Sequence, residues 1–568
     1  MNRTERAVRR LAALLPAELD ADPDLDRALA TVGSSLGSHE VRAAALVVGV
    51  SGVVPAMLAS LLFGRCGVLM GCVALALGAA LGYGLRVAPD WLATAHRARA
   101  LGGASEIVAL AVLRARIAPT PEGTAAFAAE HGRGPLAASL RGHVDRARGA
   151  ADAGWESFVA TWDEHAGLAR SVALLRAGVD APESERDRLL DRAFSAALDG
   201  TRERSAAFAA DARGPVGALY AFGVVLPLAL VAALPAAQGA GVPLPPTALA
   251  LGYDALLPLC LLVACAWVLA RRPAAFPSAP VPASHPDLPA ASRRALLAAL
   301  AGVLAGALAV AASRTVLPGW TVATAPGATL GAALFFWFRP AYAVRKNTRE
   351  LEDGLPDALA FVGRRLGRSD PPETALAAAD GVGGPAGEAL ADAATVQRRL
   401  RVGLRDALVG EHGALAAVPS PRARAGAELL ALAAAEGPHG GRVMVELADH
   451  LDGLRGVEAE TRRELASTVS TLRNTACVFA PLIGGITVSL AARLASEAPG
   501  EFVEPVPTDA LGAVVGGYVL LLAALLAGFA AALESGTDRA RIGYHVGLAL
   551  LAAAMVYPVA AAAAGVLL

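Results

Sequence analysis

The residues best suited to chemistry in this chain are clustered arginines. Arg364, Arg365 and Arg368 fall on one predicted helix. Guanidinium groups pair well with carboxylates, so such a cluster can bind an acidic surface of a partner protein. A solvated or lipid-headgroup-facing helix surface is the alternative and simpler interpretation. A second cluster has the same two interpretations: Arg398, Arg399, Arg401 and Arg405.

A second candidate site is an acidic stretch that contains glycines. Glu436, Gly437, Gly440 and Gly441 are typical of a helix C-terminus and the turn that follows it. His450 lies nearby, but the local sequence offers too few ligands to hold a metal ion. We therefore expect a turn here and no metal site.

Asp254 is the one clear ionisable residue inside a predicted apolar span. A carboxyl group at membrane depth is costly and usually faces the protein interior. It can bind the charged N-terminus or a glutamate-bearing helix of a membrane partner, or it can lie on a proton path. The structural alternative is a neutral aspartate, or one that is hydrogen-bonded to the neighbouring Tyr253.

The sequence lacks the motifs of several enzyme classes. Lys346 is the only lysine, and no phosphate-binding loop precedes it, which excludes a P-loop NTPase. No CxxC pair, HExxH motif or Ser-His-Asp order stands out. The net charge of −1 gives no indication of a nucleic-acid partner. We expect neither an enzyme nor a bound cofactor.

The elements that position these residues are predicted to be membrane helices. The chain has 568 residues, of which 55% are hydrophobic and 18% charged, and its mean hydropathy of +0.49 is typical of membrane proteins. At about 20 apolar residues per span, the sequence predicts about nine spans, of which the fifth and sixth are the weakest. The expected spans are Ala43–Phe63, Gly67–Leu85, Pro215–Ala236, Thr247–Ala270, Ala295–Ala312, Thr321–Phe338, Thr475–Leu494, Ala510–Leu533 and Tyr544–Leu567.

The placement of arginines predicts the orientation in the membrane. Most of the basic residues near span ends lie in the N-terminal segment and after residues 85, 270, 338 and 533. Because cytoplasmic segments are enriched in Lys and Arg, we expect a cytoplasmic N-terminus, two large cytoplasmic blocks and an external C-terminus in the cell membrane. The polar N-terminus is unlike a secretory signal peptide, so the first span is expected to be an uncleaved anchor.

Both polar blocks have a helical period. Leu355, Leu359, Val362 and Leu366 are spaced as on one face of a helix, and no segment alternates as a strand does. The predicted fold class is therefore all-α, a polytopic membrane protein with two cytoplasmic helical bundles. The expected domains are an N-terminal helical segment (1–42), a transmembrane hairpin (43–85), a first cytoplasmic domain (86–214), four transmembrane helices (215–338), a second cytoplasmic domain (339–474) and three C-terminal transmembrane helices (475–568).

The two blocks also share a layout that indicates duplication. Each follows a pair of apolar spans and ends in a charge-dense helix, Glu183–Arg204 or Arg455–Arg473. Each then leads into a span with a central proline, Pro227 or Pro481. The residues seven positions before these prolines are Tyr220 and Asn474.

The second block resembles a type II secretion F domain. Its opening carries Leu355-Pro356-Asp357-Ala358-Leu359, Arg365-Leu366-Gly367 and Pro372-Glu373-Thr374-Ala375-Leu376. Later, Ala435-Glu436-Gly437 with Gly440-Gly441, and then Val445-Glu446-Leu447-Ala448, are similar to the family's acidic-glycine turn and following helix. The resemblance implies that Glu436, Gly437, Gly440 and Gly441 contact a partner and couple its movement to the membrane part. The resemblance covers residues 345–495. Residues 100–235 match in layout alone, and Arg176-Ala177-Gly178 lies about where their turn is expected.

This resemblance implies a non-enzymatic part of an assembly machine. The chain length, two such domains and about nine spans look like the archaeal branch, whose members are inner-membrane platforms of type IV pili and of the archaellum. Such platforms dock on a cytoplasmic hexameric ATPase and couple its strokes to pilin-like subunits that leave the bilayer. The expected partners are therefore a secretion or pilus ATPase, pilin or archaellin subunits, membrane lipids and a second copy of the chain.

Two other functions remain open at this point. A transporter or channel would place several ionisable residues inside its spans, and only Asp254 is clear. A sensory or scaffold protein would typically carry a signalling domain that the sequence does not show. Neither alternative explains two large helical blocks, so the platform is the leading hypothesis. The choice between a pilus and an archaellum stays open.

Overall fold

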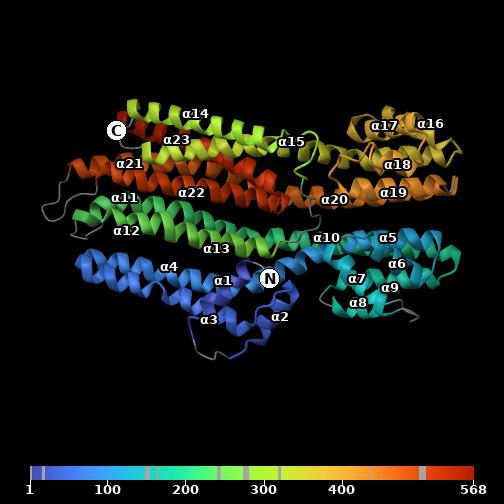
Figure 1. Cartoon of the computed structure of the whole chain (residues 1–568), viewed down its shortest axis with the longest axis horizontal. Coiled ribbons are helices and arrows are strands. Elements are labelled where there is room, and N and C mark those ends of the chain that lie inside the picture. The colour runs from blue at the N-terminus through green and yellow to red at the C-terminus, as the bar shows by residue number, and fades with distance from the viewer. Residues whose placement is uncertain are drawn as a thin grey trace.

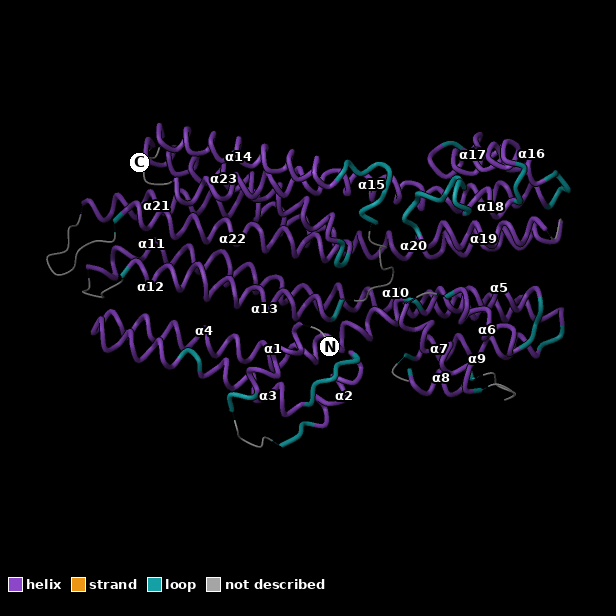
Figure 2. The backbone as a smooth tube through the Cα atoms, in the orientation of Figure 1, coloured by secondary structure: helices purple, strands orange, loops and turns teal. Residues whose placement is uncertain are grey.

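The computed structural model describes residues 3–15, 20–132, 134–147, 154–162, 165–239, 245–272, 281–316, 321–435, 438–497 and 507–567. Every regular element in this part of the chain is a helix (Figure 2). The predicted all-helical, multi-pass membrane fold is therefore confirmed.

Eight helical segments among the described residues are long and apolar enough to cross a bilayer, instead of the nine expected. They are Ser38–Leu61, Met70–Arg116, Glu183–Leu234, Pro246–Ala270, Ala291–Arg314, Gly440–Leu494, Thr508–Ser535 and Arg539–Val566. The expected span Thr321–Phe338 is helical but is not among them. The first three side chains of this expected span, those of residues 321–323, lie outside the described part of the chain, and the rest of it packs against two neighbouring helices.

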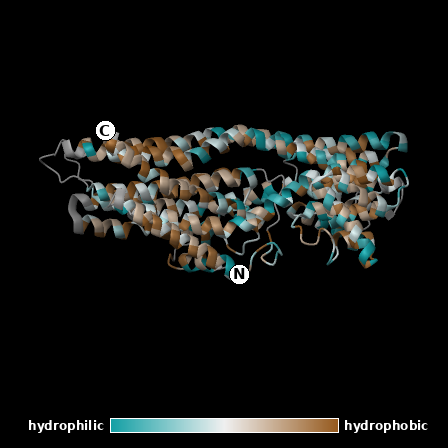
Figure 3. Cartoon of the chain, turned by 90° about the horizontal axis from the view of Figure 1, so that it is seen from above, coloured by the Kyte–Doolittle hydropathy of each residue, from teal (hydrophilic) through white to brown (hydrophobic). Residues whose placement is uncertain are grey.

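The apolar helices lie side by side in one half of an elongated molecule (Figure 1; Figure 3). We call this half the apolar layer. It contains α3 (Ser38–Val50), α11 (Leu226–Gly239), α12 (Pro246–Ala250), α13 (Leu257–Ala270), α14 (Ala291–Val316), α21 (Ala480–Glu497), α22 (Thr508–Ser535) and α23 (Arg539–Leu567), with parts of α4 (Val53–Gly102), α10 (Glu183–Tyr220) and α15 (Thr321–Leu366). Two short N-terminal helices, α1 (Arg3–Ala12) and α2 (Pro23–Val32), pack against the α3–α4 hairpin.

Two polar bundles lie next to each other at the opposite end (Figure 1). The first polar bundle contains α5 (Ala104–Ile117), α6 (Pro121–His131), α7 (Gly134–Arg146), α8 (Trp155–Thr161) and α9 (Ala166–Asp180). The second contains α16 (Pro372–Ala377), a short 3₁₀ helix (Ala378–Val382), α17 (Gly384–Leu400), α18 (Leu404–Val409) and α19 (Pro421–Ala435). Each bundle has its own hydrophobic core, and α20 (Pro438–Asn474) contributes side chains to both.

Four long helices join the bundles to the apolar layer. α4 and α15 run from the layer towards the bundles, whereas α10 and α20 run back into it (Figure 1). α15 has 46 residues, so at about 1.5 Å of rise per residue it is about 70 Å long. α15 therefore reaches from the apolar layer to the far end of the second bundle.

Glycines allow the helices of the apolar layer to approach closely. A Cβ atom added to Gly331 of α15 would lie 2.9 Å from the backbone nitrogen of Leu551 and 3.0 Å from the carbonyl oxygen of Gly547, both on α23. Small residues at such positions permit backbone contact between membrane helices, where packing rather than hydrophobicity drives association. The α15–α23 contact depends on these glycines.

Three π-helical turns occur in the layer, each just before a proline. They are Ala221–Val225 before Pro227, Leu251–Leu256 before Pro258, and Thr475–Phe479 before Pro481. Proline lacks a backbone N–H group, so it leaves a carbonyl of the preceding turn without its usual partner. A tyrosine replaces one of these bonds, because the Tyr518 hydroxyl donates to the carbonyl oxygen of Gly223, four residues before Pro227. The Tyr253 hydroxyl donates to the carbonyl oxygen of Pro227 itself at 2.7 Å.

Candidate coupling junction

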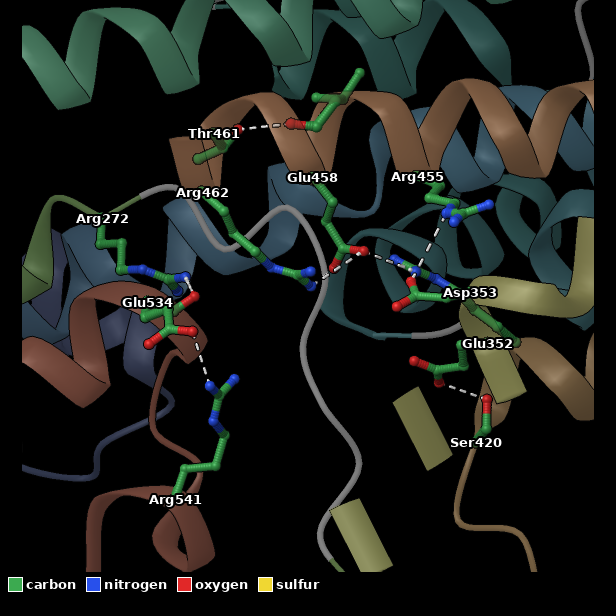
Figure 4. Close-up of polar contacts among 12 residues, drawn as sticks. Arg272, Glu352, Asp353, Ser420, Arg455, Glu458, Thr461, Arg462, Glu534 and Arg541 are labelled. Carbon is green, nitrogen blue, oxygen red and sulfur yellow. Dashed lines mark hydrogen bonds and ion pairs between the residues drawn. The ribbon is translucent and has the colours of Figure 1, made fainter. Parts of the chain in front are cut away.

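The residues that connect the second polar bundle to the apolar layer form a charged cluster around Glu534, at the end of α22. The Glu534 carboxylate accepts hydrogen bonds from Arg541 of α23 at 2.8 Å and from Arg473 of α20 at 3.1 Å. Its backbone carbonyl accepts a further bond from Arg272, just beyond α13, at 3.3 Å. Figure 4 shows Arg272 and Arg541 directed at Glu534. We call these residues the Glu534 junction.

A second ion pair extends the junction to α15. Arg345 Nε lies 2.9 Å from Asp538 Oδ2, and the two side chains are only 10% and 9% exposed. Gly536 between the two acidic residues has φ of 72°, a conformation that favours glycine and lets the chain turn sharply from α22 to α23. The α22–α23 turn is therefore held by arginines from α13, α15 and α20.

Local helix geometry explains why arginines gather at this turn. The last carbonyls of a helix lack intrahelical partners, and cations favour that end of the helix dipole. Arg272 Nε donates to the carbonyl oxygen of Leu533 in the last turn of α22 at 2.8 Å. Burial lowers the pKa of Arg272 to about 10, so it stays charged at neutral pH.

A second polar network ties the root of the second polar bundle together. Glu458 of α20 binds Arg422 of α19 at 3.2 Å and lies 3.7 Å from Arg462. Figure 4 shows the Arg462 side chain directed at Glu458. The Ser420 hydroxyl donates to Glu352 of α15 at 2.6 Å. These contacts join α15, α19 and α20 at the root of the second polar bundle.

The two polar bundles contact each other along α10 and α20. The rings of Phe194 and His450 meet edge to face with centroids 4.0 Å apart. The mostly buried Arg116 of α5 pairs with both Asp191 of α10 and Glu446 of α20. Arg116 is only 9% exposed, whereas Asp191 and Glu446 are 64% and 37% exposed, so one nearly buried guanidinium joins α10 and α20 through two exposed carboxylates.

The arginine cluster predicted from the sequence lies at the far tip of the second bundle. Arg364 and Arg368 are exposed, whereas Arg365 donates a hydrogen bond to Asp370 at 2.9 Å. From Phe338, where the expected span ends, to Leu366 the helix is about 40 Å long at about 1.5 Å per residue. The cluster therefore lies at the end of α15 that is away from the apolar layer (Figure 1).

The second cluster lies at the same tip. Gln397, near the end of α17, donates to Glu373 at the start of α16, next to the end of α15. Four exposed arginines follow or flank this contact: Arg398, Arg399, Arg401 and Arg405. This end of the second bundle therefore carries both arginine clusters, although they lie in separate segments of the sequence. We call it the arginine tip.

The acidic-glycine stretch is described only in part. Glu436 and Gly437 lie outside the described residues. Gly440 packs against the backbone of Ala433, and Gly441 packs against Gly363 and Gly367 of the α15 C-terminus. These two glycines permit the start of α20 to contact α15 and α19, so their role is packing.

The first block departs from the turn expected at Arg176-Ala177-Gly178. Gly178 lies inside α9 and packs against Leu190, and α9 continues to Asp180. The break before α10 falls at Ala181-Pro182 instead. Pro182 cannot continue the preceding helix, which explains the position of the break.

Asp254 lies in the second π-helical turn, against Gly517 of α22. A Cβ atom on Gly517 would lie 3.0 Å from Asp254 Oδ1, and this buried oxygen has no hydrogen-bond partner among the described residues. The alternative of a hydrogen bond between Asp254 and Tyr253 is not found, since the Tyr253 hydroxyl donates to the Pro227 carbonyl oxygen. The structure brings Asp254 together with neither the Glu534 junction nor the arginine tip.

The Glu534 junction was not predicted from the sequence. The arginines that follow residue 533 belong to the predicted cytoplasmic side, and Glu534 and Asp538 lie among them in one short turn. This mixture of opposite charges is the signal from which a cluster of ion pairs could have been predicted. Within the described part of the chain, no group of three or more His, Cys, Asp or Glu side chains is arranged to hold a metal ion. Comparison with known family models, curated proteins and solved structures gives no match.

Proposed function

We propose that this chain is the membrane platform of a type IV pilus-like or archaellum assembly system. It would couple a cytoplasmic hexameric ATPase to the insertion of pilin subunits into a filament, with both polar bundles in the cytoplasm. The observation that carries the proposal is the path from the bundle tip to the membrane. α15 and α20 run from the arginine tip to the Glu534 junction, which holds the α22–α23 turn.

The arrangement of helices supports a duplicated unit, as the resemblance to the type II secretion F domain implies. α6 to α10 follow one another as α16 to α20 do. α10 and α20 end at Tyr220 and Asn474, and each continues through a five-residue π-helix into a proline-containing helix. The two copies face each other along α10 and α20.

The arginine tip is the proposed contact for the ATPase. Its guanidinium groups are exposed, lie on the side away from the apolar layer, and suit an acidic protein surface. A force applied there would reach the α22–α23 turn through helices that share the Glu458 network and the Glu534 junction. In this proposal the pilin subunits contact the apolar layer, and Asp254 is the candidate polar contact within it.

The test is deletion of the gene, followed by negative-stain imaging of surface filaments and a swimming assay. We expect filaments to be lost while pilin stays in the membrane, and loss of swimming would identify an archaellum. Complementation with Arg364→Glu and Arg368→Glu together should not restore filaments. The matched control, Arg188→Glu and Arg192→Glu on exposed positions of α10, should restore them.

Unchanged filaments and motility in the deletion strain, with no second platform gene present, would overturn the proposal. Altered uptake of a solute in that strain would then favour a transporter. If the tip variant restores filaments fully, the ATPase does not dock on this tip.

A further inference from the structure

A groove of about 360 Å³ lies between α10 and α20. Both helices run from the polar bundles towards the apolar layer, so they lie side by side and parallel (Figure 1). Four carboxylates line the groove: Asp199 and Glu203 from α10, and Glu460 and Glu464 from α20. Arg202 is the one basic residue in this lining. The groove is therefore acidic.

The four carboxylates form two levels that are one helical turn apart. At the first level Arg202 bridges the two helices, because its Nη1 lies 3.1 Å from Asp199 Oδ1 and its Nε lies 3.7 Å from Glu460 Oε2. Glu203 and Glu464, at the second level, lie four residues further along each helix. Residues four apart share a helix face, and the helices are parallel, so the second level repeats the acidic pair of the first.

The second level has no arginine of its own. The residue four positions after Arg202 is Ala206, a small side chain in the lining. Neither Glu203 nor Glu464 has an ion pair or hydrogen bond with another described residue. The segments outside the described residues that adjoin the helices packed against α10 and α20 contain no lysine or arginine: 163–164, 273–280, 317–320, 436–437 and 498–506.

The hydroxyl of Ser205 is a second and independent indication of a ligand. Ser205 is only 2% exposed and lines the groove, and its Oγ has no hydrogen-bond partner among the described residues. The nearby Thr201 hydroxyl, in contrast, donates to the Ala197 carbonyl oxygen at 3.0 Å. Buried polar groups normally have a partner, and a hydroxyl oxygen can accept a bond from an N–H group. A cationic N–H donor in the groove would satisfy Ser205 and neutralise the second level.

The size and the groups of the groove fit an organic cation better than a metal ion. Within the described part of the chain, no three carboxylates are arranged to hold a metal. A volume of about 360 Å³ corresponds to roughly twelve water molecules at about 30 Å³ each, which is far larger than a bare ion. A guanidinium group binds carboxylates through several N–H donors, as Arg202 does at the first level. The groove therefore suits an arginine or lysine side chain.

We propose that this groove binds a basic side chain from the cytoplasmic flank of a partner's membrane helix. Ala206 lies nine residues before Pro215, where the expected span begins, so the groove is about 14 Å from that span at about 1.5 Å per residue. Membrane proteins concentrate Arg and Lys just outside the cytoplasmic ends of their helices. The partner's basic residue supplies at the second level the charge that Arg202 supplies at the first. This assignment rests on the proposed function for the cytoplasmic position of the bundles.

The test uses the full-length chain in phosphatidylcholine vesicles and fluorescence energy transfer to a labelled probe peptide. The probe is an apolar Leu-Ala helix of about 20 residues followed by Arg-Arg, and the matched peptide ends in Gln-Gln. We expect the Arg-Arg probe to associate at least about fivefold more strongly, and Glu203→Gln with Glu464→Gln to remove that preference. The control is Glu183→Gln with Glu185→Gln, which removes the same charge from exposed positions at the start of α10.

A further variant supplies the cation from within the chain. Ala206→Arg places an arginine one turn after Arg202, where it can pair with Glu203 and Glu464. We expect this variant to melt about 2 °C higher than the wild type and to lose its preference for the Arg-Arg probe. A misfolded protein would not gain thermal stability, so the two results together identify an occupied site.

Equal association of the two peptides, or equal losses in the groove variant and its control, would overturn the proposal. An Ala206→Arg protein that still prefers the Arg-Arg probe would also overturn it. Displacement of the probe by spermidine at equal concentration would show that the ligand is a free polyamine. These measurements do not involve filaments: normal filaments in the deletion strain would contradict the proposed function alone, and a chain that does not select the Arg-Arg probe would contradict this inference alone.

Discussion

The hydroxyl of Tyr518, on α22, donates a hydrogen bond to the carbonyl oxygen of Gly223, in the first π-helical turn. Gly223 lies four residues before Pro227, so its carbonyl is the one whose usual α-helical donor the proline removes. A buried tyrosine from a distant helix thus satisfies an acceptor that the local sequence leaves open. In the membrane, where water is scarce, such a partner is required.

Substitution of Tyr518 by Phe should therefore destabilise the apolar layer. We expect a loss of about 1 kcal/mol in the free energy of unfolding, in the range of hydrogen bonds between membrane helices. Thermal unfolding in detergent measures it. Tyr83→Phe is the control, because Tyr83 is 63% exposed. Equal stability of the two variants would show that the Gly223 carbonyl does not need Tyr518.

Removal of the single negative charge of Glu534 should have a larger effect on stability. Glu534→Gln leaves Arg473 and Arg541 without their carboxylate, and the Glu534 side chain is only 24% exposed. We expect a loss of about 1–3 kcal/mol in unfolding free energy. Glu183→Gln, an exposed position at the start of α10, should change stability little. A Glu534→Gln protein as stable as the wild type would contradict a structural role for the junction.

The Arg345–Asp538 pair should show direct energetic coupling. In a double-mutant cycle with Arg345→Gln and Asp538→Asn, we expect a coupling energy of about 1–3 kcal/mol, because both side chains are almost buried. The neighbouring pair Lys346–Glu350 is exposed and 3.7 Å apart, so it should show no measurable coupling. Additive effects at Arg345 and Asp538 would mean that the two residues act separately.

Close helix contact predicts a cost for even a small side chain at Gly331. Gly331→Ala places a methyl group within 3.0 Å of the α23 backbone, which must move away. We expect a loss of about 1–3 kcal/mol, whereas Gly217→Ala, with open space around it, should be neutral or stabilising. The melting temperatures of the two variants in detergent decide this. A neutral Gly331→Ala would show that α15 and α23 are further apart than described.

Parts of the fold could be predicted from the amino-acid sequence alone. The apolar runs predicted where eight of the membrane helices lie, but three of these helices continue far beyond the expected spans: Met70–Arg116, Glu183–Leu234 and Gly440–Leu494. The prolines at 227 and 481 marked equivalent positions that both follow a π-helix. The sixth expected span, Thr321–Phe338, stays a prediction, because the side chains of residues 321–323 lie outside the described part of the chain. Its Thr and Gly residues suit contact with α14 and α23, and average hydropathy does not distinguish such a helix from a weak span.

For the candidate sites too, some features could be predicted from the sequence and others could not. Arg364 and Arg368 were predicted to be exposed helix residues, and they are. Gly440 and Gly441 were assigned to a turn, but they lie in the first turns of α20, where they allow contact with α15 and α19. A glycine needed for a turn and a glycine needed for close packing look alike in a sequence.

The sequence by itself determined which segments are helical and which are apolar enough for the membrane, because both properties depend on residues within one or two turns of each other. The tertiary structure alone decided the partners of the charged and hydroxyl groups. Tyr518 and Gly223 are 295 residues apart, and Arg345 and Asp538 are 193 residues apart. Such pairs form because the packing of whole helices brings distant side chains together, and no local pattern encodes that arrangement.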